Sequence, residues 1–163
     1  MKYMGSKGRI AKEILPIILK DRIPNQYYVE PFVGGCNSLD KVDGNRIASD
    51  TNKYIISMWK ALQSGWIPPR RVDREQYDCI KNNKENDLKL TGWVGIACSY
   101  SGKWFGGYAG NYPISRIKKN GLIPNYQDES YNTAIKQVGL LKGVIFYNLS
   151  YEELPIPQNS IIY

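Results

Sequence analysis

Val29-Glu30-Pro31-Phe32-Val33-Gly34-Gly35, with Ser49-Asp50 further along, is the part of the sequence that decides the fold. Residues 27–32 predict a short buried strand, and the glycines predict a tight turn that lets the backbone approach a ligand closely. Residues 46–50 predict a second strand that ends in an acid. An acid about 20 residues after such a turn can hold the two hydroxyls of a ribose, and Asp50 follows Gly34 by sixteen positions. The alternative is an ordinary strand-to-helix turn in which Asp50 caps the next helix.

Helical and strand-like segments alternate around this stretch and predict an α/β sheet. The first helix is expected to begin near Ser6 as its N-cap, with Pro16 limiting or kinking it, and to use an apolar stripe made of Ile10, Ile14, Ile17 and Ile18. A second helix is expected from about residue 51, ending at Gly65 and placing on one face Ile55, Trp59 and Leu62. A third is expected near residues 130–141. Strands at 144–147 and 160–163 complete the expected sheet, in the order third-second-first-fourth.

The middle of the chain, residues 68–125, has a different character. It holds Pro68-Pro69, a short helical stretch at 74–81 and a run rich in glycine and aromatic residues. We expect it to be an insertion with its own function. The predicted division is therefore a first sheet portion at 1–66, an insertion at 67–126 and a second sheet portion at 127–163.

Composition narrows the class of protein. The chain has 163 residues, 42% of them hydrophobic, and a formal net charge of +7, which suits a polyanionic partner. The absence of histidine excludes histidine-based triads and argues against a zinc enzyme. Three widely spaced cysteines predict reduced thiols. With no apolar run of membrane-spanning length and no signal-like start, we expect a cytoplasmic protein.

Several segments resemble the Dam-type DNA adenine methyltransferases, especially phage-encoded members. Lys2-Tyr3-Met4-Gly5-Ser6-Lys7 matches that family's aromatic-x-Gly-x-Lys element, residues 29–35 match Glu-Pro-Phe-x-Gly-Gly, and Asp50-Thr51-Asn52 matches Asp-x-Asn. The match continues in order through residues 101–108 and 159–163. The resemblance implies a partial Rossmann-like sheet that binds S-adenosylmethionine, with a small, mostly helical target-recognition domain inserted between the second and third strands. It also implies that the protein acts in the cytoplasm of a bacterium or of a phage-infected host cell.

The resemblance assigns a cofactor site for S-adenosylmethionine to six residues: Tyr3, Lys7, Glu30, Phe32, Gly34 and Asp50. In it, Lys7 pairs with the cofactor carboxylate and Asp50 binds the ribose. Residues 148–151 are expected to flank the adenine ring. The alternatives are a solvated Lys7 and a Phe32 that packs in the core.

The same resemblance places double-stranded DNA at the insertion. Six aromatic residues lie between positions 92 and 112, interleaved with glycines, and cations stand on both sides of them. Aromatic rings stack on bases and cations contact phosphates. The expected DNA-binding residues are Lys103, Trp104, Tyr108, Arg116, Lys118 and Lys119. The alternative is that Trp93 and Trp104 are core residues and the cations form a solvated face.

One departure from the family pattern concerns the chemistry. In the family, the strand equivalent to residues 160–163 leads into Asp-Pro-Pro-Tyr, which positions the target amino group, and these 163 residues contain no such motif. Pro68-Pro69 is flanked by Ile67 and Arg70 and does not replace it. We therefore expect no catalytic residue here and a fragment that is inactive alone unless a second chain completes it. The alternative is a non-catalytic DNA- or cofactor-binding module, and an unrelated nucleotide-binding protein is a third interpretation.

Overall fold

A small parallel sheet forms one end of the molecule. The computed structural model describes residues 1–111, 117 and 120–163. Its strands are β1 (Tyr28–Glu30), β2 (Arg46–Ser49), β3 (Ile145–Tyr147) and β4 (Ile161–Ile162), in the order β3-β2-β1-β4. All three pairings are parallel. The predicted strands and their predicted order are both confirmed.

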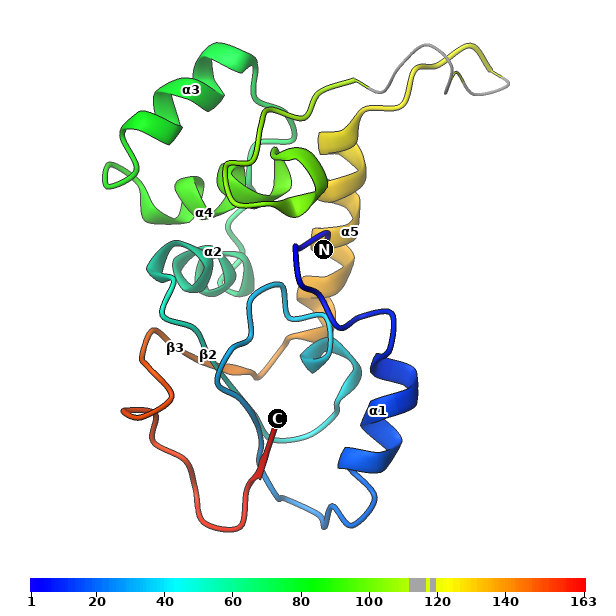
Figure 1. The fold of residues 1–163 in the computed structure, drawn as a ribbon, viewed down its shortest axis with the longest axis vertical. Helices are drawn as coiled ribbons and strands as arrows, with labels where there is room; N and C mark the ends of the chain where they lie inside the picture. The colour runs from blue at the N-terminus through cyan, green and yellow to red at the C-terminus, as the bar shows by residue number, and fades with distance from the viewer. Residues whose placement is uncertain (112–116, 118–119) are drawn as a thin grey trace.

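The two faces of the sheet are covered differently. Side chains alternate between faces along a strand, so Tyr28 and Ala48 enter the main core while Val29 and Ile47 point to the other side. There they meet Leu154, from the long segment between β3 and β4 that runs beside the sheet in Figure 1. This face is therefore covered by a loop, within the part of the chain that the structure describes.

Helices make up most of the remaining structure. Their bounds are α1 (Ala11–Ile18), α2 (Lys53–Gln63), α3 (Arg74–Asn82), α4 (Leu88–Ala97) and α5 (Tyr126–Leu140), with short 3₁₀ turns η1 (Leu39–Lys41) and η2 (Tyr100–Gly102). Asn52 caps α2, and Gly65 follows its end with φ +90°, as predicted. Asp50 is therefore not the cap of this helix.

The first helix differs from the prediction. It begins at Ala11 and not near Ser6, whose Oγ instead accepts a hydrogen bond from the Gly8 amide in the preceding loop. The predicted isoleucine stripe is also wrong, because the fully buried residues of α1 are Ala11 and Leu15, and Ile17 is 76% exposed. The later start lengthens the N-terminal segment that lies free of the helix.

Helix α4 was not predicted from the sequence. Its glycines hide the helical pattern, but Gly92 is where α4 lies closest to α2: a Cβ there would stand 2.2 Å from the Tyr54 carbonyl oxygen. The last seven residues of the helix, 91–97, are all buried, including Trp93, so this stretch has no polar face to signal an amphipathic helix. One core runs from α4 through α2 to β1.

Figure 1 shows α3 and α4 at the end of the molecule opposite the sheet, with α5 running between the two ends. The division at 66/67 and 126/127 remains a prediction, because the main core is shared across it. No helix in the described ranges combines the length and the apolarity needed to cross a membrane. The thiols of Cys36 and Cys98 are free and buried, and that of Cys79 is free and exposed.

Candidate functional site

A cavity of about 430 Å³ opens at the carboxyl ends of β1 and β4. The strand order reverses between these two strands, because β2 and β3 lie on one side of β1 and β4 lies on the other. In open parallel sheets, ligands bind outside the carboxyl ends of the strands at such a reversal. The cavity size falls in the usual range for small-molecule sites, about 300 to 1,000 Å³. The strand order and the cavity therefore indicate the same position for a ligand, at the carboxyl ends of β1 and β4.

Four of the six predicted cofactor residues line this cavity, namely Tyr3, Lys7, Glu30 and Phe32. The other two, Gly34 and Asp50, lie beside it and are joined to each other, because the Gly34 amide donates to Asp50 Oδ2 at 3.0 Å. The N-terminal segment, the glycine turn and the end of β2 therefore meet in one place, and cofactor binding by these six residues remains a prediction.

The glycine turn is held from behind by two buried side chains. Trp59 of α2 donates its indole N–H to the Gly34 carbonyl at 2.9 Å. Gln137 of α5 donates to the carbonyl oxygens of Gly35 and Cys36. The sequence analysis did not identify either side chain as part of the site. Trp59 was expected only as a packing residue, and Gln137 carried no signal until its buried position on α5 was known.

Tyr3 covers the front of the same turn. A Cβ at Gly34 would lie 2.5 Å from Tyr3 Cε1, and a Cβ at Gly35 would lie 2.6 Å from Tyr3 Cβ. Gly34 also has φ +45°, in the region that favours glycine. The turn thus requires glycine for two reasons: the close ring and the backbone conformation. Burial, and then the charge of Asp50, raise the pKa of the Tyr3 hydroxyl.

Asp50 already has backbone partners. Its Oδ2 accepts from Gly34, and its Oδ1 accepts from the Asn52 amide at 2.9 Å. A carboxylate offers about four acceptor positions, so Asp50 retains capacity for further donors. Asn148, which follows β3, donates to the Asp50 carbonyl at 2.8 Å and ties the ends of β2 and β3 together.

An exposed aromatic pair lies at the same edge of the sheet. Phe32 follows β1 and is 74% exposed, so the alternative in which it packs in the core is wrong. Its ring centroid is 5.8 Å from that of Tyr151, which comes from the segment after β3. Two such rings offer apolar faces to a planar ligand.

Glu30 is the buried charge of the cavity. Burial raises the pKa of its carboxyl to about 7, opposed by the hydrogen bond that Tyr28 donates to Glu30 Oε1 at 2.9 Å. Asp40 adds to the increase in the pKa, and Lys41 opposes it. Glu30 therefore changes charge near neutral pH at the wall of the cavity.

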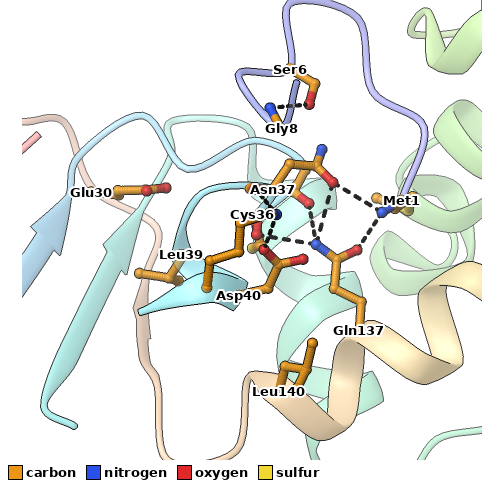
Figure 2. Close-up of polar contacts among 12 residues, drawn as sticks. Met1, Ser6, Gly8, Glu30, Cys36, Asn37, Leu39, Asp40, Gln137 and Leu140 are labelled. Carbon is orange, nitrogen blue, oxygen red and sulfur yellow. Dashed lines mark hydrogen bonds and ion pairs between the residues drawn. The ribbon is translucent and has the colours of Figure 1, made fainter. Parts of the chain in front are cut away.

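Figure 2 shows the other wall, where the Asn37 amide stands between Gln137 and the segment that carries Ser6 and Gly8. Asn37 Oδ1 accepts from the Met1 amino group at 3.1 Å. Its Nδ2 is buried and has no hydrogen-bond partner among the described residues. Lys7 lies in the same wall, with Nζ 3.4 Å from the Gly5 carbonyl. Asn37 was also missed by the sequence analysis.

A second, larger cavity of about 790 Å³ adjoins the first and shares with it Tyr3, Gly5 and Ser6. Its wall includes Lys103 from the predicted DNA-binding set, together with Arg9 and the 69% exposed Tyr100. Together these lining residues make a basic groove, defined here by Arg9, Lys103 and Tyr100.

Two other residues of the predicted set, Trp104 and Tyr108, are not among the residues that line this groove. Trp104 is half-buried, stacks on Tyr54 with ring centroids 5.4 Å apart, and covers Gly95 of α4. Tyr108 is also half-buried and donates its hydroxyl to the Val72 carbonyl at 3.0 Å. Both make packing contacts, in keeping with the alternative for Trp104. Arg116, Lys118 and Lys119 lie outside the described residues.

The comparison with family models agrees with this geometry. The model of the D12 class N6 adenine-specific DNA methyltransferases matches residues 3–89, slightly more than half of the chain. That range includes all six predicted cofactor residues and both strands, β1 and β2, after which the glycine turn and Asp50 lie. No curated protein matched the chain. The matched family, the glycine turn and the cavity at the strand reversal lead to one conclusion: this chain belongs to the D12 class of N6 adenine-specific DNA methyltransferases.

Proposed function

We propose that the cavity of about 430 Å³ at the β1–β4 reversal binds S-adenosylmethionine. The observation that carries the proposal is that Tyr3, in the wall of this cavity, meets Gly34, which is bonded to Asp50 beside the cavity, from three separate parts of the sequence. When bound, the cofactor supplies an activated methyl group on a sulfonium sulfur. The side chains of this site bind the cofactor and orient it.

The residues present fit this group. The Gly34-Gly35 backbone, with no Cβ, leaves room for Tyr3 to close the turn. In the proposal, Asp50 holds the ribose hydroxyls with its remaining acceptor positions, and the Phe32–Tyr151 pair contacts the adenine ring. Lys7 offers a cation to the carboxylate end.

The basic groove is the proposed place for DNA. It adjoins the cofactor cavity, and a base must reach the methyl group to be modified. Arg9 and Lys103 supply positive charge for phosphates, and Tyr100 offers an exposed ring face for stacking. The net charge of +7 supports a polyanionic partner.

The motif that would position the target amine is absent from these 163 residues. Methyl transfer to an exocyclic amine depends on holding and polarising that amine, and the 163 residues contain no Asp-Pro-Pro-Tyr. We infer that these residues bind cofactor and DNA but need a second polypeptide segment with that motif for transfer. The same observation supports the second candidate, a non-catalytic binding module of this family.

Two measurements test the proposal. Equilibrium dialysis with methyl-tritiated S-adenosylmethionine tests the cofactor site, and a methyl-transfer assay on adenine-containing duplex DNA tests the need for a second polypeptide segment. We expect one cofactor bound per chain and no transfer without a second polypeptide. Restored transfer with a chain carrying Asp-Pro-Pro-Tyr supports the split enzyme, and DNA binding without any transfer supports the module. Transfer by this chain alone would contradict the inferred incompleteness, and no retained cofactor would contradict the proposed site.

A further inference from the structure

The N-terminal segment, residues 2–8, is held from two sides. On one side Tyr3 closes against the glycine turn, in which a Cβ at either glycine would lie 2.5 to 2.6 Å from it. On the other side lies a loop of residues 99–107, which includes η2 and belongs to the predicted insertion. The Met4 amide donates to the Gly102 carbonyl of this loop at 3.1 Å. The segment therefore lies between the glycine turn and a loop from a distant part of the sequence.

The contact at Gly102 has no room for a side chain. A Cβ there would lie 2.4 Å from the Lys2 carbonyl oxygen and 2.7 Å from the Tyr3 amide nitrogen. Its φ of +66° also lies in the left-handed region that favours glycine. Both obstacles are backbone atoms, which cannot rotate away as the end of a side chain can. Any other residue at position 102 must therefore displace either the N-terminal segment or the loop.

The 99–107 loop is anchored to α3 and α4. Ser99 is fully buried, and its Oγ lies 3.0 Å from the hydroxyl oxygen of Tyr77 in α3. The Phe105 amide donates to a carbonyl of α4 at 2.9 Å. In the N-terminal segment, by contrast, residues 4–7 are exposed. We therefore expect strain at the contact to move the N-terminal segment and not the loop.

The loop itself lies outside the cofactor cavity. Tyr3 lines that cavity, and none of its lining residues comes from the 99–107 loop. The loop instead contributes Tyr100 and Lys103 to the basic groove, and Gly102 stands between them in the sequence. A contact with Gly102 can therefore affect the cofactor only through the segment that carries Tyr3.

We propose that Gly102 is a positioning residue for the cofactor, because it holds Tyr3 against the glycine turn and so sets the shape of the cavity. This inference rests on the proposed cofactor site and adds to it a residue that does not line the cavity. The 99–107 loop then serves both sites: Tyr100 and Lys103 face the basic groove, and Gly102 supports the cofactor-binding segment.

Calorimetric titration with S-adenosylhomocysteine compares two glycines of this loop. Gly102→Ala places a Cβ against the backbone of Lys2 and Tyr3. Gly107→Ala, also at a positive φ of +124°, places it where no atom lies within 4 Å. Both variants strain the loop, but only the first presses on the N-terminal segment. We expect Gly102→Ala to lower the affinity by at least about tenfold, the scale of an overpacked contact, and Gly107→Ala to change it by less than about twofold.

A double-mutant cycle with Tyr3→Ala separates positioning from a general loss of stability. Because Gly102 acts through Tyr3, adding Gly102→Ala to Tyr3→Ala should lower the affinity much less than Gly102→Ala does alone. Thermal unfolding checks that each variant is folded at the temperature of the titration. Additive losses of affinity, or an unchanged affinity in a folded Gly102→Ala chain, would overturn the role of Gly102.

Hydrogen–deuterium exchange in the unmodified chain tests the same contact even where Gly102→Ala does not fold. Binding of S-adenosylhomocysteine should slow exchange at the Met4 amide, which donates to Gly102, and at the amides of Gly102 and Lys103, which close η2. Protection of the glycine turn with unchanged exchange at these three amides would overturn the proposal. Failure of the unmodified chain to bind S-adenosylhomocysteine would instead overturn the proposed cofactor site.

Discussion

Asp50 connects the glycine turn with the start of α2, since its two carboxylate oxygens accept from the amides of Gly34 and Asn52. We predict that Asp50→Asn lowers affinity for S-adenosylmethionine by about 1.5 to 3 kcal/mol, the range for hydrogen bonds to a charged group. Asp50→Ala should do the same and also destabilise the turn. Calorimetry gives the affinities and urea denaturation the stabilities. An unchanged affinity in a folded variant would remove Asp50 from the site.

Glu30 makes stability depend on pH. Because burial raises the pKa of its carboxyl from 4.5 to about 7, folding favours the protonated form. Its contribution is fully present below the unfolded pKa and is lost as the pH rises through 7. We predict that this group lowers the free energy of unfolding by about 3 kcal/mol between pH 4.5 and pH 8.

The check is urea denaturation across that range for the unmodified chain and for Glu30→Gln. The glutamine variant should lose most of this pH dependence, because an amide does not titrate there. A dependence equal in both chains would show that other groups cause it.

Trp59 and Trp93 are alike in burial and hydrogen bonding, so each can serve as the control for the other. Each is buried and donates its indole N–H to one carbonyl, that of Gly34 at 2.9 Å and that of Pro69 at 3.0 Å. We predict that either Trp→Phe change destabilises the chain by about 1 kcal/mol or more, through a lost hydrogen bond and lost volume. Only Trp59→Phe should also weaken cofactor binding, because only Trp59 holds the glycine turn. Equal cofactor affinities in the two variants would contradict this.

Single residues were predictable from sequence where the backbone conformation or chemistry is distinctive. The turn at Gly34 and its neighbour Asp50 could be predicted because a tight turn and an acid at the end of a strand have a recognisable order. Asn37 and Gln137 were not, because ordinary polar residues acquire their roles only through contacts between segments 100 residues apart.

At the scale of elements, the contact between α2 and α4 depends on Gly92. A Cβ there would meet the backbone of Tyr54 at 2.2 Å, whereas a Cβ at Gly139 of α5 would meet nothing within 4 Å. We predict that Gly92→Ala destabilises the fold by several times the ~1 kcal/mol by which alanine stabilises a helix relative to glycine. Gly139→Ala should stabilise it by about that amount. Thermal unfolding of both variants measures these changes in stability. A Gly92→Ala variant more stable than the unmodified chain would contradict the close packing of α2 against α4.

Amphipathic elements were predictable and uniformly buried ones were not. The stripe of Ile55, Trp59 and Leu62 gave α2 correctly, with each of them buried. Helix α4 is buried at every position from 91 to 97 and contains glycines, so its sequence lacks the period that signals a helix. In α1 the apolar period was real, but the buried residues are Ala11 and Leu15, neither of which is β-branched, and not the isoleucines.

At the scale of the whole molecule, the charge of +7 bears on DNA. We predict that Arg9→Ala combined with Lys103→Ala lowers duplex affinity and reduces the salt slope of binding by about 1.8, or ~0.9 per phosphate contact. Lys12→Ala combined with Lys20→Ala, exposed on and beside α1, removes the same charge away from the groove. Fluorescence anisotropy at several salt concentrations compares them. Equal salt slopes in the two double variants would contradict DNA binding at the basic groove.

Lys118 and Lys119 remain a separate prediction from the sequence. Lys118→Ala combined with Lys119→Ala should also lower DNA affinity and flatten the salt dependence, if these cations contact phosphates. The same anisotropy series measures it. An unaltered slope would place the two lysines away from DNA.

The sheet order was predictable for the whole molecule because parallel strands need crossover connections, which allow few topologies. The shared core between the sheet and the residues of the predicted insertion was not, because it depends on how Gly92 lets two helices meet. The location of the cavity follows from the strand reversal once the order β3-β2-β1-β4 is known.

Hydrogen–deuterium exchange with and without S-adenosylhomocysteine tests the central claim most directly, since it reports where on this chain the ligand lies. The account predicts slowed exchange in residues 3–8 and 33–38, the N-terminal segment and the glycine turn that border the cavity. Exchange in α3 should stay unchanged. Ligand-dependent protection confined to other segments, or none at saturating ligand, would contradict a cofactor site at the glycine turn.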